Sequence, residues 1–330
     1  MARLTLSIAV GDYDHVRDLL TGEVRADGIE LIVAKKAPVE EIFYRFTNHR
    51  EWDVSEMSFA KYVALAAQDD RDLTAIPVFP SRAFRHSSIY VRADSALATP
   101  AELAGKRIGI PEWAQTASVY TRGLLAHEFG VALTSVAWTQ AGVNEPGRKE
   151  KVTLHLPPGV RYRSAPDSSL SQLLLDGELD AVLSARAPTP FRDGSGRVRR
   201  LLADPRAAEL AYWKKTGIFP IMHVVAIRRE IIELHPWVAT NLLQGFEAAK
   251  RRSLERMADV TASPVPLPWV AEYAEASRRI LGDDFWPYGV EANRATLDAF
   301  LDFAAEQGVS RRRLDVRELF VESTLGSVRV

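Results

Sequence analysis

The stretch Val78–Val91 constrains this chain most, because it places two arginines and a histidine inside a run that otherwise reads as a buried strand. Arg82, Arg85 and His86 stand there among Phe, Ile, Tyr and Val side chains. Burying such groups costs free energy unless an anion or another polar partner meets them. We interpret the two arginines as ligands of an anionic molecule. An edge segment with its arginines in water, or a pair of structural salt bridges, would explain the pattern without a ligand.

Length and composition set the broad class of the protein. A chain of 330 residues predicts two domains or lobes. Its 47% hydrophobic and 26% charged residues are typical of a soluble globular protein. The net charge of −1 gives no electrostatic reason to expect nucleic acid or an anionic membrane as a partner. The sequence has no cysteine, which excludes disulfides, thiolate nucleophiles and cysteine-zinc sites.

The first residues read as part of the fold. Apolar residues alternate with small polar ones from Leu4 to Val10, which predicts a strand. The first residues show neither the unbroken apolar core nor the cleavage site of a secretory signal. No apolar run in the chain approaches the length of a membrane span. We therefore predict a cytoplasmic protein with no membrane partner.

Two strand–loop–helix units carry polar residues at the start of their helices. In the first, the strand of residues 52–57 is followed by Ser58, which caps a helix. In the second, the strand of residues 106–110 leads through a loop to Thr116 at the start of another helix. Because helix N-termini attract anions, two such units that face each other would clamp an anion between them. A plain capping role for Ser58 is compatible with the same pattern.

Further candidates stand at strand ends, in helices and in one aromatic turn. Ligands of open α/β folds bind at the carboxyl ends of strands, which favours side chains in the loops that follow them. A histidine inside an apolar strand can also be an ordinary core residue, and an arginine on a helix can be a solvated charge. The candidates of this kind are Tyr13, Glu56, Arg122, His223 and Tyr288.

Several common motifs are absent from the sequence. It contains no G-x-G-x-x-G, Walker A, G-x-S-x-G or H-E-x-x-H pattern, so nucleotide binding, serine hydrolysis and zincin chemistry lose support. We predict neither a cofactor nor a metal site. A divalent metal held by His86, His223 and Glu56 remains an alternative, because sequence separation does not define geometry.

The order of elements resembles the type II periplasmic-binding-protein fold, an α/β fold with two lobes and an interlobe cleft. The segments Leu103–Gly109 and Gly177–Ala181 resemble the first strand and a later turn of its second lobe. The resemblance implies that residues 1–91 and 221–330 form lobe one, and that residues 92–220 form an inserted lobe two. We expect the chain to cross between the lobes near residues 91–94 and 217–220.

Five segments together resemble the 4,5-dihydroxyphthalate decarboxylase family. They are Glu56–Phe59, Phe79–Ser87, Arg122–Leu125, Lys215–His223 and Trp286–Arg294, and they span nearly the whole chain. The resemblance implies a carboxy-lyase that acts on a hydroxylated aromatic acid without an organic cofactor. A solute-binding protein for a small carboxylate is the main alternative, since a fold alone does not define function. A cytoplasmic ligand sensor is a third hypothesis, although no DNA-binding module is visible.

Decarboxylation of such an acid needs a base at the phenol, an acid at the ring carbon and cations for a carboxylate. We predict Glu56, His86 and His223 as catalytic residues, with His86 favoured for proton transfer. The predicted substrate-binding residues are Arg82, Arg85, Ser58, Tyr13, Thr116, Arg122 and Tyr288. The expected partner is a small aromatic carboxylate, and the sequence leaves the formation of a homo-oligomer open.

Overall fold

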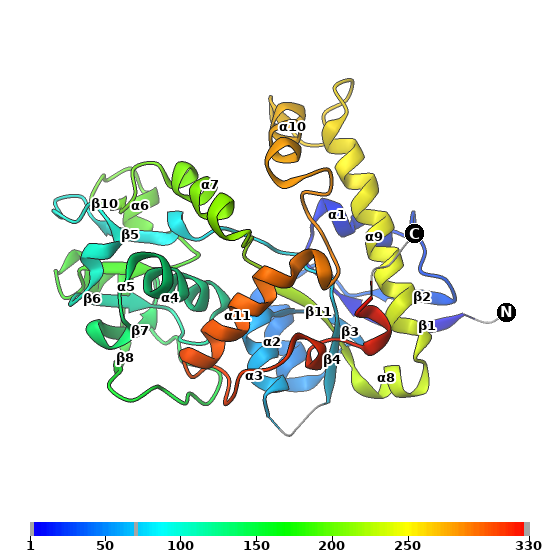
Figure 1. Cartoon of the computed structure of the whole chain (residues 1–330), viewed down its shortest axis with the longest axis horizontal. Coiled ribbons are helices and arrows are strands. Elements are labelled where there is room, and N and C mark those ends of the chain that lie inside the picture. Colours follow the sequence, from blue (N-terminus) through cyan, green and yellow to red (C-terminus); the bar gives the residue numbers. More distant parts are fainter. Residues whose placement is uncertain (1–2, 69–71, 327–330) are drawn as a thin grey trace.

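The computed structural model describes residues 3–68 and 72–326, and it is organised around two sheets (Figure 1). The first sheet has the strand order β2-β1-β3-β11-β4, and the second has the order β10-β5-β9-β6-β7-β8. The strands of the first sheet are β1 (Leu4–Ala9), β2 (Ile29–Val33), β3 (Val54–Ser58), β4 (Leu73–Ile76) and β11 (His223–Arg228). Those of the second are β5 (Ile89–Arg92), β6 (Arg107–Ile110), β7 (Ala137–Gly142), β8 (Arg161–Ser169), β9 (Ala181–Leu183) and β10 (Val198–Arg200).

Helices come from both ends of the chain around the first sheet and from its middle around the second (Figure 1). The former are α1 (Asp14–Leu20), α2 (Val39–His49), α3 (Phe59–Ala66), α8 (Arg229–Leu234), α9 (Trp237–Ala258), α10 (Val270–Leu281) and α11 (Arg294–Glu306). The latter are α4 (Thr116–Phe129), α5 (Leu170–Leu175), α6 (Thr189–Arg192) and α7 (Pro205–Thr216). The 3-10 turns are η1 (His86–Ser88), η2 (Pro100–Leu103), η3 (Leu133–Ser135), η4 (Glu291–Asn293), η5 (Val316–Glu318) and η6 (Glu322–Thr324).

The chain crosses between the sheets earlier than the sequence predicted. Strand β5 pairs antiparallel with β9 and β10 of the second sheet, so the expected boundary after residue 91 falls inside a strand of lobe two. Its apolar residues extend that sheet, which requires the crossing to precede Ile89. On the return path, Ile221 forms an antiparallel bridge with Arg82. The two crossing segments, residues 77–88 and 217–222, therefore lie side by side.

Strand β3 holds a central position in the first sheet. It runs parallel to β1 and antiparallel to β11, and all five of its residues are buried. The register places Val225 opposite Glu56 and His223 opposite Ser58. Side chains from the end of β3 and the start of β11 are thereby brought to one edge of the sheet.

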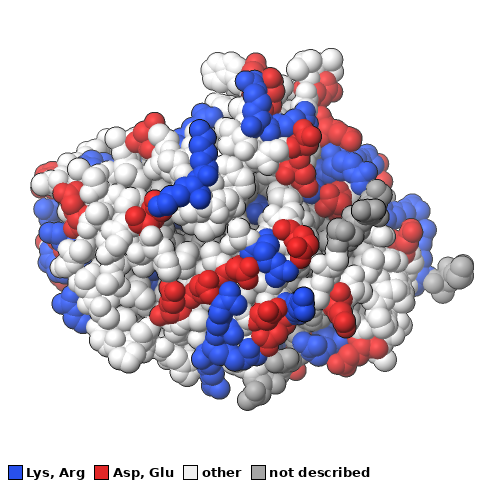
Figure 2. All heavy atoms as spheres, in the orientation of Figure 1, with Lys and Arg blue, Asp and Glu red and all other residues white. Residues whose placement is uncertain are grey.

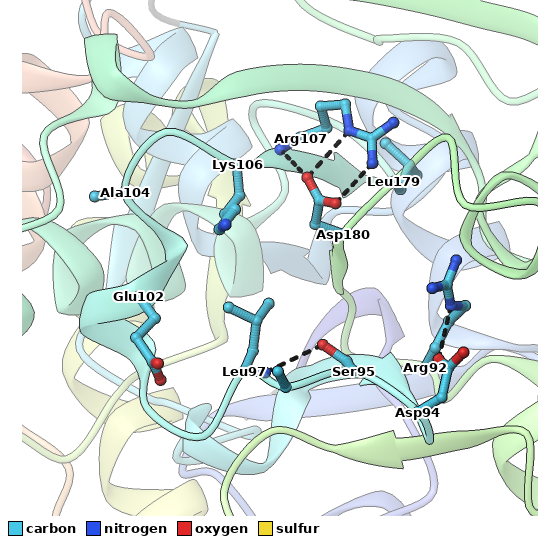
Figure 3. Close-up of a pocket in the computed structure, with 11 residues that line it drawn as sticks. Arg92, Asp94, Ser95, Leu97, Glu102, Ala104, Lys106, Arg107, Leu179 and Asp180 are labelled. Atoms are coloured by element: carbon cyan, nitrogen blue, oxygen red, sulfur yellow. Dashed lines mark hydrogen bonds and ion pairs between the residues drawn. The ribbon is translucent and has the colours of Figure 1, made fainter.

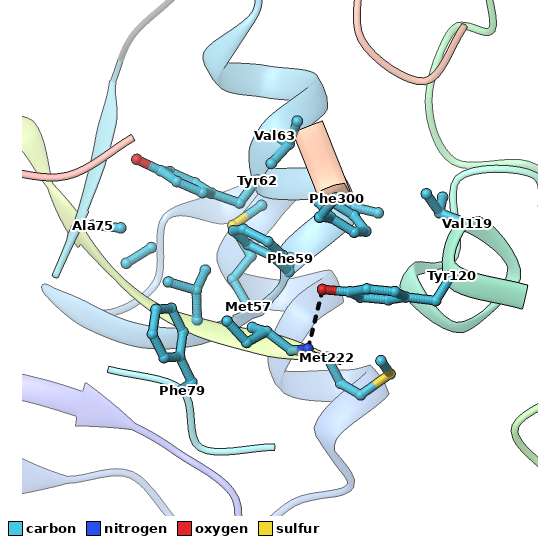
Figure 4. Packing of buried hydrophobic residues seen from close by; sticks show 14 of the residues in the cluster. Met57, Phe59, Tyr62, Val63, Ala75, Phe79, Val119, Tyr120, Met222 and Phe300 are labelled. Atoms are coloured by element: carbon cyan, nitrogen blue, oxygen red, sulfur yellow. Dashed lines mark hydrogen bonds between the residues drawn. The ribbon is translucent and has the colours of Figure 1, made fainter. Parts of the chain in front are cut away.

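Aromatic packing connects the two lobes (Figure 4). The rings of Phe59 and Phe300 stack with centroids 4.6 Å apart, and Tyr120 of α4 lies 4.9 Å from Phe300. The Tyr120 hydroxyl also accepts a hydrogen bond of 3.1 Å from the backbone N–H of Ile221 in the crossing segment. Burial of a phenylalanine contributes about 1.5–3 kcal/mol, so this contact makes a substantial contribution to fixing α4 against α3 and α11.

Charged side chains of both signs are interspersed on the face seen in Figure 2, as expected for a net charge of −1. Within residues 3–68 and 72–326, no helix is both long and apolar enough to cross a membrane.

Candidate active site

A cavity of about 280 Å³ lies between the two lobes. This volume lies just below the usual range of about 300–1,000 Å³ for ligand pockets, which suits a single-ring molecule. One part of its wall is formed by side chains from α2, β3, α3, β11 and the two crossing segments. The other part is formed by α4 and by loops of lobe two. Among the lining residues are Phe43, Ser58, Lys61, Ser81, Arg85, Met222 and His223, together with Glu112, Thr116, Arg148, Lys151 and Arg186.

A buried carboxylate and a histidine are paired at the edge of the first sheet. The Oε1 atom of Glu56 lies 2.6 Å from Nδ1 of His223 and accepts a hydrogen bond of 2.8 Å from the Tyr13 hydroxyl. Its Oε2 atom accepts a hydrogen bond of 2.7 Å from the backbone N–H of Gly11. Burial, together with the charge of Glu56, raises the pKa of Tyr13 well above its ordinary value. The tyrosine is therefore a neutral donor that helps to hold the carboxylate in place.

The pairing determines which nitrogen of His223 is available to a ligand. Because Nδ1 faces the Glu56 carboxylate, we assign the Nδ1–H tautomer to the neutral ring, which leaves Nε2 as the free acceptor. The ring of Phe43 meets the imidazole edge-on at 4.8 Å and limits its rotation. His223 lines the cavity, whereas Glu56 and Tyr13 lie behind it.

The two helix N-termini predicted to face each other do meet. The Ser58 and Thr116 hydroxyl oxygens are 3.0 Å apart, and Thr116 Oγ1 also accepts a hydrogen bond of 3.0 Å from the backbone N–H of Ala60. Both residues line the cavity. This contact links the start of α3 in one lobe to the start of α4 in the other.

The two arginines of the crossing segment have different surroundings. Arg85 lines the cavity, and its Nε donates to the sulfur of Met222 at 3.2 Å. No carboxylate of the described residues pairs with its guanidinium, and burial lowers its pKa to about 10. Arg85 is therefore a poorly hydrated cation beside the cavity.

Arg82 does not line the cavity, contrary to our prediction. Its guanidinium donates to the carbonyls of Phe219 at 3.1 Å and Pro287 at 2.6 Å, and also to the side-chain oxygen of Asn293. These contacts tie the crossing segments to the aromatic turn before α11. The arginine is held by neutral acceptors of the protein itself, which fits a structural role.

His86 does not line the cavity either. The side chain lies in η1, is only 2% exposed and packs against the ring of Tyr212 in α7 at a centroid distance of 5.3 Å. Burial lowers its pKa to about 4. His86 is absent from the cavity wall, so the metal set of His86, His223 and Glu56 is not assembled. Among the described residues, no three histidine or acidic side chains come together as metal ligands.

Arg122 and Tyr288 lie outside the cavity as well. Arg122 is buried within α4, stacks 3.9 Å from the Trp113 ring centroid and donates to the side-chain oxygen of Gln307 at 2.9 Å. Tyr288 lines a different hollow next to α9, with Lys250 4.7 Å above its ring. Neither residue lines the interlobe cavity, because packing turns both side chains away from it.

A charged cluster that the sequence analysis missed occupies the lobe-two side of the cavity. The carboxylate of Glu112 is 1% exposed and lies 3.1 Å from the Lys61 amine, 2.7 Å from Arg148 and 3.7 Å from Lys151. Burial acts to raise the pKa of Glu112, but the three cations outweigh it and the pKa is lowered. One sequence signal was available, because Lys61 stands one helical turn after Ser58 in an otherwise apolar helix.

A larger cavity of about 620 Å³ lies entirely in lobe two (Figure 3). Its charged groups largely pair with one another, as in the contact of 2.7 Å between Arg107 and Asp180 and that of 2.9 Å between Arg92 and Asp94. None of the site residues predicted from the sequence lines it. The interlobe cavity, with its histidine–carboxylate pair and its unpaired arginine, is therefore the candidate active site.

Comparisons with known proteins agree with this architecture. No family model matches the chain. It is 41% identical over 331 residues to the 4,5-dihydroxyphthalate decarboxylase of Comamonas testosteroni, covering all of both chains. It is also 43% identical over 215 residues to the enzyme of that name from Pseudomonas putida, a match that covers 65% of this chain and 83% of the relative.

Solved structures with the same fold include both binding proteins and an enzyme. The periplasmic aliphatic sulphonate-binding protein SsuA of Escherichia coli matches with a TM-score of 0.55 at 14% identity, covering 98% of this chain and 99% of that one. The desulfurization enzyme DSZB matches with a TM-score of 0.50 at 14% identity, covering 98% of this chain and 99% of that one. At such identities the likeness supports the predicted fold and nothing more specific.

Proposed function

Because this chain belongs to the 4,5-dihydroxyphthalate decarboxylase family, we propose that it removes carbon dioxide, without oxidation, from a hydroxylated phthalate-like acid. The observation that carries the proposal is the interlobe cavity, which places the Glu56-bound His223 and the unpaired Arg85 on one wall. A base and a cation beside one small cavity are what such an acid requires.

The chemistry begins at a ring hydroxyl that stands para to a carboxylate. Removal of its proton pushes electrons into the ring and makes the carboxyl-bearing carbon basic. That carbon takes up a proton, the bond to the carboxyl group breaks, and its electron pair restores the aromatic ring. The protein must therefore supply a base at one end of the ring and a proton at the other.

His223 suits the role of the base. Its Nε2 is the ring nitrogen left for the substrate hydroxyl, and the imidazolium formed there would be stabilised by Glu56 at 2.6 Å. Tyr13 and Gly11 hold the carboxylate on its other lone pairs, which keeps the histidine in one orientation. Glu56 and Tyr13 are positioning residues in this scheme, because they act through His223.

Arg85 suits the carboxylate that stays on the ring. A guanidinium binds a carboxylate through two parallel hydrogen bonds, and its partial burial strengthens the contact. A cation gripping the departing carboxylate would stabilise the ground state and slow its loss. We therefore assign Arg85 to the retained group, with the Ser58 and Thr116 hydroxyls as further polar contacts.

The test incubates the purified protein with 4,5-dihydroxyphthalate and with a panel of hydroxylated benzoates, and measures turnover as the release of carbon dioxide. His223→Asn should retain binding and lose about 10²–10⁴-fold in turnover, the usual contribution of general acid–base catalysis. A wild-type protein that binds one of these acids tightly but converts none would instead be a solute-binding protein.

Location in the cytoplasm and the formation of a homo-oligomer remain predictions from the sequence.

A further inference from the structure

The proposed reaction needs a proton donor for the ring carbon, and the residue favoured from the sequence is not at the cavity. His86 packs against Tyr212, and His223 is engaged as the base. The donor must therefore be sought among the other groups that line the cavity. It must carry a proton near neutral pH and be able to give it up.

Most of the lining groups fail that requirement. Arginines do not lose a proton in proteins, and the hydroxyls of serine and threonine are very weak acids. Glu112 is held as an anion by three cations, and Glu40 by the guanidinium of Arg186, whose Nε lies 3.0 Å from it. Two lysines remain, with side chains 10% exposed at Lys61 and 41% exposed at Lys151. Only Lys61 is well shielded from water.

The fold places Lys61 close to the base. Ser58, the last residue of β3, is paired with His223 across the sheet. Lys61 follows one turn into α3, and both it and His223 line the same cavity of about 280 Å³. A single ring in so small a space would meet the histidine and the lysine together.

We propose that Lys61 is the catalytic acid that protonates the carboxyl-bearing carbon, and that Glu112 positions its ammonium group. This inference rests on the proposed function and completes it. When His223 has taken the hydroxyl proton, a proton of the Lys61 ammonium forms the new C–H bond. The C–C bond then breaks, carbon dioxide leaves, and the returning electron pair gives a phenolate that recovers its proton from His223. The neutral amine of Lys61 takes a proton from water when the product departs.

The surroundings of Lys61 fit this role. Burial lowers the pKa of its amine, which makes the ammonium a readier donor than an exposed lysine. Glu112 lies 3.1 Å away and is itself bound by Arg148 and Lys151, so its position is fixed from several sides. An ammonium group has three N–H donors, so contact with Glu112 leaves others for the cavity.

The experiment separates protonation of the ring carbon from the loss of carbon dioxide. An enzyme that protonates this carbon in the substrate should also add a deuteron to the same carbon of the product phenolate, and loss of the original proton to the amine of Lys61 then exchanges that hydrogen for deuterium. The probe is 3,4-dihydroxybenzoate in D₂O, with deuterium incorporation at ring carbon 6 followed by NMR. Lys61→Arg keeps the charge and cannot donate, so both exchange and turnover should fall by about 10²–10⁴-fold while 3,4-dihydroxybenzoate still binds.

Lys250→Arg is the matched control, because Lys250 is another buried lysine that contacts carboxylates, at 2.8 Å from Glu247 and 2.6 Å from Asp284, outside the cavity. It should keep both activities. If Lys61→Arg does not fold, Lys61→Met provides the same test with an uncharged side chain of similar length. Exchange at the wild-type rate in a folded Lys61 variant, with the wild type active, overturns this inference alone. A wild type that neither exchanges nor releases carbon dioxide overturns the proposed function and this inference together.

Discussion

Replacing Glu56 with glutamine tests the proposed site most directly, because it changes one charge and almost no volume. The carboxylate is fully buried and meets the backbone of Gly11, the Tyr13 hydroxyl and Nδ1 of His223. In Glu56→Gln the amide oxygen can keep the Gly11 hydrogen bond. The amide NH₂ then faces Nδ1 of His223, which must become an acceptor. The ring proton therefore moves to Nε2, the position that should receive the substrate proton.

The expected loss follows from this change of tautomer. A histidine with its proton on the wrong nitrogen cannot act as a base, so turnover should fall by the full value of general base catalysis, about 10²–10⁴-fold. That range corresponds to about 2.7–5.4 kcal/mol of activation free energy at 1.36 kcal/mol per factor of ten. The stability of the fold should change much less, by about 0.5–1.5 kcal/mol, because the hydrogen bonds are rearranged rather than removed.

The assay measures carbon dioxide release at saturating 4,5-dihydroxyphthalate alongside ligand affinity and thermal unfolding. Asp53→Asn is the matched control, because the Asp53 carboxylate also accepts hydrogen bonds from a backbone N–H and a hydroxyl, both of Ser7 at 2.8 Å, outside the cavity. Since Glu56 acts through His223, the double variant with His223→Asn should be no slower than His223→Asn alone. Independent, additive losses in that cycle would refute the reasoning.

Three further predictions concern binding, packing and pH. Arg85→Gln should weaken binding of an aromatic carboxylate by about 1.5–3 kcal/mol, the value of a charge-assisted hydrogen bond, whereas Arg82→Gln should chiefly lower the melting temperature. Calorimetry with phthalate and thermal scans compare the two variants. An equal loss of affinity in both would contradict the assignment. Gly123→Ala should destabilise the fold by about 1–3 kcal/mol, because a Cβ there would lie 2.4 Å from the Phe303 ring. Denaturant unfolding measures this loss of stability. An unchanged midpoint would argue against the close contact of α4 and α11. Burial lowers the pKa of His86 from 6.5 to about 4, so the unfolded state binds a proton that the folded state refuses as pH falls through this range, and stability declines. His86→Gln should flatten the fall in unfolding free energy between about pH 6.5 and 4, and an unaltered slope in urea titrations would count against a buried neutral histidine.

Local patterns in the sequence determined the elements that build the site. The strand that contains Glu56, the helix that follows Ser58 and the helix that starts at Thr116 are all short-range features, and the structure has each of them, although the Ser58 side chain makes no capping hydrogen bond. Their meeting across the cleft followed from a general property of open α/β folds, in which loops at strand ends face the ligand. The family inferred from five dispersed segments is confirmed by the relative from Comamonas testosteroni, and the fold by SsuA.

Only the tertiary structure decided which charged side chains reach the cavity. Arg82 and Arg85 lie in an irregular crossing segment and His86 begins the 3-10 turn η1, so the alternation of a strand does not fix the direction of their side chains. Their orientation depends on distant partners, namely Pro287 and Asn293 for Arg82, Met222 for Arg85 and Tyr212 for His86. The same holds for Glu112, whose cations come from α3, which supplies Lys61, and from the loop that holds Arg148 and Lys151. The direction of a buried charged side chain depends on its partners, and those partners are brought together only when distant segments of the chain pack against one another.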